Sequence, residues 1–206
     1  MNRILLPCLL VLLIAGAATG QTADQSALLC NLSREKAPVI RGVKLGMTSD
    51  ELHASVPGIR DDYKSVVEQA QKFPHYGETS LGANPRETGK GERFEGIEGF
   101  YFHLFDDHVM QYVVYYRGAG STPRGPTWKR LDDMIARFTE AYHLPGPGNW
   151  VATEGARVLK CQGFEVRISN PDQIQVDVRE PGNPWAAEQT KRREAYEEQL
   201  RREFKP

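Results

Sequence analysis

The chain has 206 residues, of which 40% are hydrophobic and 26% charged, with 26 Lys and Arg against 27 Asp and Glu. The formal net charge of -1 argues against a general nucleic-acid-binding protein, which would carry a large basic excess. Mean hydropathy is -0.51 and there is one long apolar run, which excludes a protein with many membrane spans. With 19 Gly, 13 Pro and 3 Cys, the composition also excludes collagen-like and cysteine-framework classes.

Residues 1–20 have the organisation of an export signal. A short basic start precedes an apolar run from Ile4 to Ala18, and the small residues that follow fit cleavage before Gln21. The alternative is an uncleaved membrane anchor, although the run is short for a span and contains Pro7. No cysteine has the sequence context of a lipoprotein anchor. The mature protein is therefore expected to be periplasmic or secreted, with no stable membrane span.

Signal cleavage leaves two cysteines, Cys30 and Cys161. Exported proteins fold under oxidising conditions, so these residues predict a single disulfide bond. Two separate buried thiols are the alternative. A catalytic cysteine–histidine pair is disfavoured, because no neighbouring residue in the sequence activates either thiol.

The first half of the mature chain predicts a strand, two helices and a loop. Val39–Leu45 is typical of a short strand. Thr48 and Glu51 have the spacing of a capping box that begins a helix. A second helix fits residues 61–73, which place apolar side chains on one face. The glycine-rich residues 77–96 predict a long loop, either functional or disordered.

The strongest strand signal is a hairpin of residues 100–105 and 109–116, turning at Asp106–Asp107. With a two-residue turn, His103 faces Met110 and Tyr101 faces Tyr112. A core face is then expected to carry Phe100, Phe102, Leu104, Val109, Val113 and Tyr115. The opposite face is expected to carry Tyr101, His103, Phe105, His108, Met110, Tyr112 and Val114.

This second face of the hairpin is aromatic and histidine-rich. Tyr, Phe and Met are enriched in the cores of interfaces, so the face is a candidate binding surface. Coverage by the 77–96 loop or by the C-terminal helix is the alternative. His103 and His108 are diagonal neighbours beside Asp106, but two histidines do not complete a zinc site, so a metal site is only an outside candidate.

The second half predicts one helix followed by a series of strands. Thr127 is the expected cap of the helix, whose apolar residues recur at spacings of three and four up to Tyr142. Strands are expected at 157–161, 164–168 and 173–179, and the last of them alternates apolar and polar residues.

These elements predict an α+β fold with helices packed on one face of an antiparallel sheet. A single domain is expected at 21–183, with two related halves at 38–120 and 127–182. Residues 184–206 predict a charged C-terminal helix. Three Glu–Arg pairs in it have i,i+4 spacing: Glu188–Arg192, Glu197–Arg201 and Glu198–Arg202. Its apolar stripe has three residues, which is too few for a coiled coil. A solvated helix is therefore favoured over a helix that packs against a second copy or a partner protein.

The segment from Gly42 to Leu52, GVKLGMTSDEL, resembles the opening of small exported bacterial domains. These are the SmpA/OmlA (BamE-like) outer-membrane lipoproteins and the β-lactamase-inhibitor-protein-like repeats. Phe105–Val109 is similar to their acidic hairpin turn. The resemblance covers residues 39–116 and implies two helices on an antiparallel sheet. It also implies binding to other envelope proteins, without catalysis.

We therefore expect an exported, non-enzymatic binding protein that contacts a protein or a small ligand through the aromatic face. No cofactor and no nucleic-acid partner are expected. The sequence contains no nucleophile elbow, phosphate-binding loop, HExxH or Cys-x-x-Cys motif. The alternative is an envelope hydrolase or a metal-dependent enzyme that uses His103, His108 and Asp106.

Overall fold

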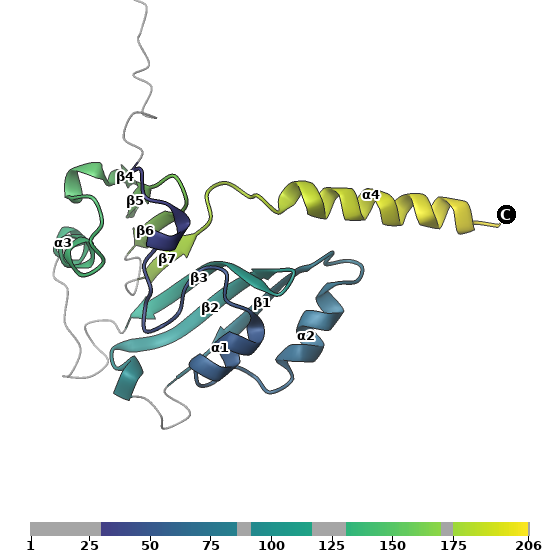
Figure 1. The fold of residues 1–206 in the computed structure, drawn as a ribbon, viewed down its shortest axis with the longest axis horizontal. Helices are drawn as coiled ribbons and strands as arrows, with labels where there is room; N and C mark the ends of the chain where they lie inside the picture. Colours follow the sequence, from purple (N-terminus) through teal and green to yellow (C-terminus); the bar gives the residue numbers. More distant parts are fainter. Residues whose placement is uncertain (1–29, 86–91, 117–130, 170–174, 206) are drawn as a thin grey trace, which may run out of the picture.

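The computed structural model describes residues 30–85, 92–116, 131–169 and 175–205. They form four α-helices and one seven-stranded antiparallel sheet of order β1-β2-β3-β7-β6-β5-β4 (Figure 1). The strands are β1 (Glu78–Ala83), β2 (Ile97–Phe105), β3 (His108–Tyr116), β4 (Val151–Thr153), β5 (Ala156–Lys160), β6 (Glu165–Ser169) and β7 (Gln175–Arg179). The helices are α1 (Ser49–Ser55), α2 (Tyr63–Ala70), α3 (Leu131–Ala141) and α4 (Ala186–Glu203). The predicted α+β class is confirmed.

Some predicted features lie outside the described residues. They are the export signal at 1–20, the helix cap at Thr127 and part of the expected loop, residues 86–91. Within the described ranges, no helix is both long and apolar enough to cross a membrane.

The two halves of the chain share one sheet because β3 pairs with β7. Tyr112 lies opposite Val178, and Val114 lies opposite Val176. All four side chains are fully buried. The hydrophobic core is therefore continuous across the two halves.

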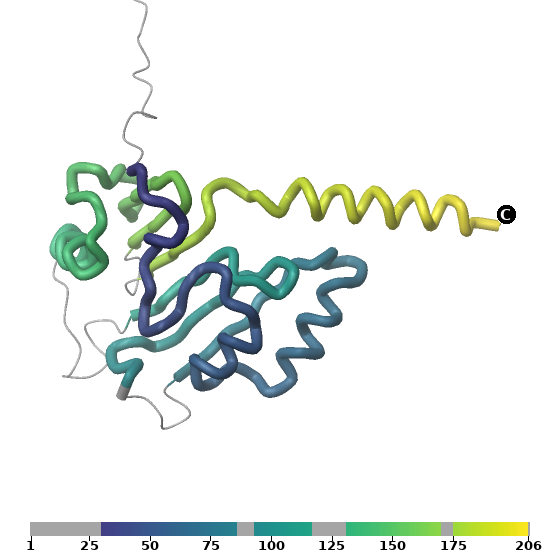
Figure 2. Tube along the Cα trace, in the orientation of Figure 1, coloured from purple at the N-terminus to yellow at the C-terminus, as the bar shows by residue number. Residues whose placement is uncertain are grey.

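The sheet has an inner and an outer face. The inner face is buried and includes Leu81, Phe102, Leu104, Tyr112, Val166 and Val178. Helices α1, α2 and α3 add Leu52, Tyr63, Ile135 and Phe138 to the same core. The register places Ser80, Tyr101, His103, Val113, Tyr115 and Asp177 on the outer face. Figure 2 shows α4, in yellow, extending away from the rest of the chain.

Two local predictions are confirmed in atomic detail. Thr48 caps α1: its Oγ1 accepts a hydrogen bond from the Glu51 amide, and the Glu51 carboxylate accepts one from the Thr48 amide. The hairpin turns at Asp106 and Asp107, whose φ angles are 48° and 65°. Such positive values suit a two-residue turn that follows the twist of the strands.

The predicted strand at Val39–Leu45 is wrong, because this segment folds back on itself. Ile40 and Val43 donate to each other's carbonyl oxygens, both at 3.0 Å. Between them Arg41 and Gly42 have φ angles of 54° and 89°. The apolar residues that suggested a strand are the buried ends of a tight turn, which packs on the inner face.

The prediction of one continuous loop over 77–96 is also wrong, because β1 forms at the sheet edge. Ser80 lies opposite His103 and Gly82 opposite Tyr101. Only Leu81 and Ala83 are buried in this strand. An edge strand with so few core residues lacks the hydrophobic alternation by which a strand is recognised in a sequence.

The predicted disulfide bond between Cys30 and Cys161 is present, and its cysteines are 131 residues apart. Hydrogen bonds extend the contact: Cys30 N donates to Lys160 O at 3.0 Å, and Gln162 N donates to Cys30 O at 2.9 Å. Gly163 permits this approach, since a Cβ atom there would lie 2.1 Å from the Arg34 amide nitrogen. The N-terminal segment is thus held against the end of β5.

We predict that replacing both Cys30 and Cys161 by Ser lowers the free energy of unfolding by about 3–5 kcal/mol, because a long loop is no longer closed in the unfolded chain. Urea unfolding of the oxidised protein and of the double variant measures the difference. A reducing agent should destabilise the parent and leave the variant unchanged. Thiol labelling of Cys30 and Cys161 in the denatured, unreduced protein would contradict the prediction.

Candidate functional site

The outer face at the β2–β3 hairpin differs from the predicted face because of a β-bulge. Next to the turn, Leu104 lies opposite Val109, but the following pair is His103 and Gln111. Met110 is the additional residue of β3, and its carbonyl accepts a hydrogen bond from the Glu180 amide at 2.9 Å. One extra residue reverses the face on which every later side chain of β3 lies.

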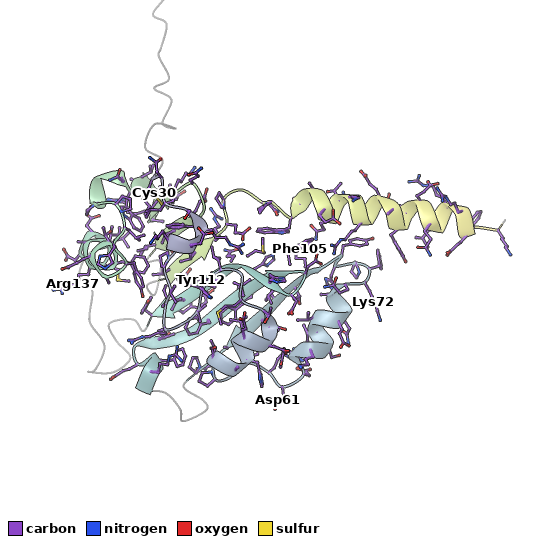
Figure 3. The ribbon with its side chains drawn as sticks, viewed as in Figure 1. Cys30, Asp61, Lys72, Phe105, Tyr112 and Arg137 are labelled. Carbon is purple, nitrogen blue, oxygen red and sulfur yellow. A yellow bond between two sulfur atoms is a disulfide. The ribbon has the colours of Figure 1, made fainter. Side chains whose placement is uncertain are left out.

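Tyr112 and Val114 therefore belong to the core and not to the predicted binding face. Tyr112 is 0% exposed. Its hydroxyl donates to the Pro38 carbonyl at 2.5 Å, and burial raises the pKa of the phenol. Val113 and Tyr115, which were expected in the core, lie on the outer face opposite Tyr101 and Gly99. Figure 3 shows Tyr112 within the body of the protein.

The other predicted binding residues differ widely in exposure. Tyr101 is 43% exposed, whereas Phe105 is buried. His103 is half-buried on the outer face, and Met110 is half-buried at the bulge. His108 is exposed, with its Nδ1 2.8 Å from the Asp106 carbonyl oxygen. The structure thus brings Tyr101, His103 and Phe105 together along one strand and separates the rest.

A series of hydrogen bonds crosses the outer face from β2 to β1. The Tyr101 hydroxyl donates to Ser80 Oγ at 2.7 Å. Ser80 Oγ lies 3.4 Å from His103 Nδ1, and His103 Nε2 lies 2.9 Å from Glu78 Oε1. Gln189 of α4 donates to the other oxygen of Glu78. We call Glu78, Ser80, Tyr101 and His103 the β1–β2 network.

The first turns of α4 cover the hairpin end of this face. The Trp185 ring lies 5.8 Å from the His103 ring, between centroids. The Arg192 guanidinium lies 5.1 Å from the centre of the Phe105 ring and donates to both carboxylate oxygens of Asp106 at 2.6 Å. These hydrogen bonds raise the pKa of Arg192. The C-terminal helix, which was the alternative to an open face, thus covers Phe105, labelled near the start of α4 in Figure 3. Tyr101 remains 43% exposed.

Beyond these contacts α4 has no buried residue. The three Glu–Arg pairs form at N–O distances of 3.1, 3.7 and 3.1 Å. Tyr196 stacks on Phe73, with ring centroids 5.2 Å apart. Further along, Leu200 is 48% exposed and Phe204 is 73% exposed.

The geometry gives the proposed metal ligands other partners. His103 is paired with Glu78, and the Asp106 carboxylate is paired with Arg192. Among the residues that the structure describes, no three His, Cys, Asp or Glu side chains are grouped closely enough to hold a metal ion.

Two cavities lie away from the outer face. One of about 370 Å³ is next to the N-terminal turn and is lined by Arg34, Lys44 and Glu51, among others. The other, of about 500 Å³, is a shallow apolar depression on α3 at Phe138 and Tyr142. Neither is lined by a residue of the β1–β2 network.

The fold defines an α+β protein with an antiparallel sheet and one partly exposed face. The chain matches no protein-family model, and comparisons with curated proteins and with solved structures find no significant similarity.

Sequence reasoning missed the part of the network that comes from β1. Glu78 and Ser80 lie in the segment predicted to be a loop. Trp185, which precedes α4, and Gln189 within it are distant in the sequence. The available signal for a strand was the two-residue spacing of Glu78, Ser80 and Gly82. None of these residues is apolar, so the spacing did not indicate a strand. Only the pairing with β2 identifies these residues as neighbours of His103.

We predict that Tyr112→Phe lowers the free energy of unfolding by about 1–2 kcal/mol, because the buried Pro38 carbonyl loses its donor. Tyr115→Phe, on the half-buried outer face, should change it by less than about 0.5 kcal/mol. Urea unfolding measures both. Equal effects of the two substitutions would show that Tyr112 does not have this core role.

Proposed function

We propose that this chain is an exported envelope protein that binds another protein through the open part of its outer face. The observation that carries the proposal is the exposed ring of Tyr101, with half-buried Val113 directly opposite it and Tyr115 further along β3. Tyrosine combines a large apolar area with a polar tip, which suits the centre of a protein interface. We call Tyr101, Val113 and Tyr115 the outer-face patch.

The surroundings of the patch favour a protein over a small molecule. Across the sheet from Val113 lies Asp177, which accepts a hydrogen bond from Gln111 Nε2 at 3.0 Å. Arg179 beside it is paired with Glu165 at 3.0 Å. An apolar patch beside ordered polar side chains on a sheet has the composition of an interface core and rim. Small ligands instead bind mainly in concave sites.

Export is supported by two independent features. The N-terminal sequence has the three regions of a signal peptide. The disulfide bond between Cys30 and Cys161 fits an oxidising compartment. Residues 39–116 also resemble exported domains that bind other envelope proteins, which supports both export and protein binding.

We predict that a photo-crosslinking amino acid at position 101 captures a defined protein partner from the compartment in which this protein resides. Position 39 is the matched control, because Val39 is 47% exposed but belongs to the N-terminal segment that packs on the inner face. Crosslinked products separated by mass and identified by peptide sequencing provide the measurement. Identical products from positions 101 and 39 would contradict binding through the patch.

We also predict that the protein isolated from its native host begins at Gln21. Intact mass measurement distinguishes this form from the full chain. A mass that includes residues 1–20 would show that the signal is retained as an anchor. Because crosslinking reports on the face and mass on the N-terminus, each part of the proposal can fail separately.

A further inference from the structure

The β1–β2 network places four polar side chains in an order that follows from sheet geometry. Ser80 and His103 are directly opposed, so their side chains point to the same face. Glu78 and Tyr101 are their neighbours two residues along each strand, on that same face. Diagonal positions across an antiparallel pair are within reach of long and aromatic side chains. The pairing therefore aligns a hydroxyl, an imidazole and a carboxylate.

The hydrogen-bond partners determine which ring nitrogen of His103 carries a hydrogen and where the Ser80 hydroxyl hydrogen points. In the neutral form of the imidazole, which is the form that can act as a base, His103 Nε2 carries the ring hydrogen, because the Glu78 carboxylate 2.9 Å away only accepts. His103 Nδ1 is then an acceptor, 3.4 Å from Ser80 Oγ. The Tyr101 hydroxyl already donates to Ser80 Oγ, so the serine hydrogen is left to point to the imidazole. This arrangement is the one that activates a serine hydroxyl.

We propose that Ser80 is a nucleophile toward small carboxylic esters, with His103 as its base and Glu78 holding the imidazole. This activity goes beyond the proposed binding role. It also differs from the hydrolase expected as an alternative from the sequence, because His103 is retained but His108 and Asp106 take no part.

The step balances with water as the only co-reactant. Ser80 Oγ attacks the ester carbonyl carbon while its proton moves to His103 Nδ1. The C–O bond to the alcohol then breaks, and the alcohol leaves with that proton. Water, deprotonated by His103, attacks the acyl-serine, releases the acid and restores the Ser80 hydroxyl. In the free protein the Tyr101 hydroxyl donates to Ser80 Oγ. Once Ser80 Oγ bonds to the carbonyl carbon, the same hydroxyl can donate instead to the adjacent carbonyl oxygen, where negative charge develops.

Two features of the site select an ester as the substrate class. An alcohol leaves a tetrahedral intermediate more readily than an amine, so a single oxyanion donor is sufficient. Tyr101 is 43% exposed, which opens the site to solvent on one side, while buried Trp185 lies beside the His103 ring on the other. A small, soluble ester can therefore reach Ser80 in a transient encounter, which does not need the concave site on which tight binding of a small ligand depends.

The test is covalent labelling of the full chain with a serine-reactive fluorophosphonate, followed by peptide mass mapping. The unaltered protein is the first sample, so the result does not depend on a variant that folds. We expect one phosphonyl group per chain, on Ser80. Ser169 is the matched internal control, because it lies on the outer face opposite Gln175 and Ala156 and not opposite a histidine. Labelling of Ser80 no greater than that of Ser169 would overturn the proposal.

Variants then assign the roles. His103→Gln keeps an amide donor for Glu78 but cannot take the serine proton, so labelling should slow by about 100-fold. Tyr101→Phe should lower the hydrolysis of p-nitrophenyl acetate by about 100-fold. Labelling at an unchanged rate in folded His103→Gln, judged by an unchanged far-ultraviolet circular dichroism spectrum, would also overturn the proposal. Crosslinking from position 101 tests binding independently of this result.

Discussion

The structure depends most on the register between β2 and β3. The two-residue turn sets the first pair, but the extra residue at Met110 shifts the following pairs by one, from His103 and Gln111 to Gly99 and Tyr115. Because side chains alternate between the faces of a strand, this shift sends Tyr112 into the core and turns Val113 outward. The same register aligns Tyr112 and Val114 with Val178 and Val176 of β7, so that the two halves bury one continuous inner face.

The chain ends hold this sheet in different ways. At the N-terminal side a covalent bond to Cys161 and hydrogen bonds with its neighbours fix the segment beside β5. At the C-terminal side α4 is held by a bidentate ion pair with Asp106, a cation–π contact with Phe105 and the packing of Trp185. These contacts come from the start of the helix, and Tyr196 adds a stacked contact with Phe73. The remaining helix depends on its internal Glu–Arg pairs, which are individually weak at an exposed surface.

Binding and chemistry meet at the outer face because both proposals use Tyr101. Its ring is available to a partner, whereas its hydroxyl is committed to Ser80. The network is ordered by residues from three elements, since Gln189 of α4 donates to the carboxylate that holds His103. A protein seated on the outer-face patch would therefore cover the ring next to Ser80 and control access to it.

The sequence alone determined those features whose causes are local. The capping box of α1, the turn at Asp106–Asp107 and the Glu–Arg pairs of α4 each depend on residues within four positions of one another. The α+β class and the cysteine pairing also followed, from periodicity and from the number of cysteines. Tertiary structure alone decided the bulge at Met110, the identity of β1 as a strand and the turn within 39–45. In each case the deciding interactions join segments far apart in the chain, and a local hydrophobic pattern contains no information about which partner a strand will meet.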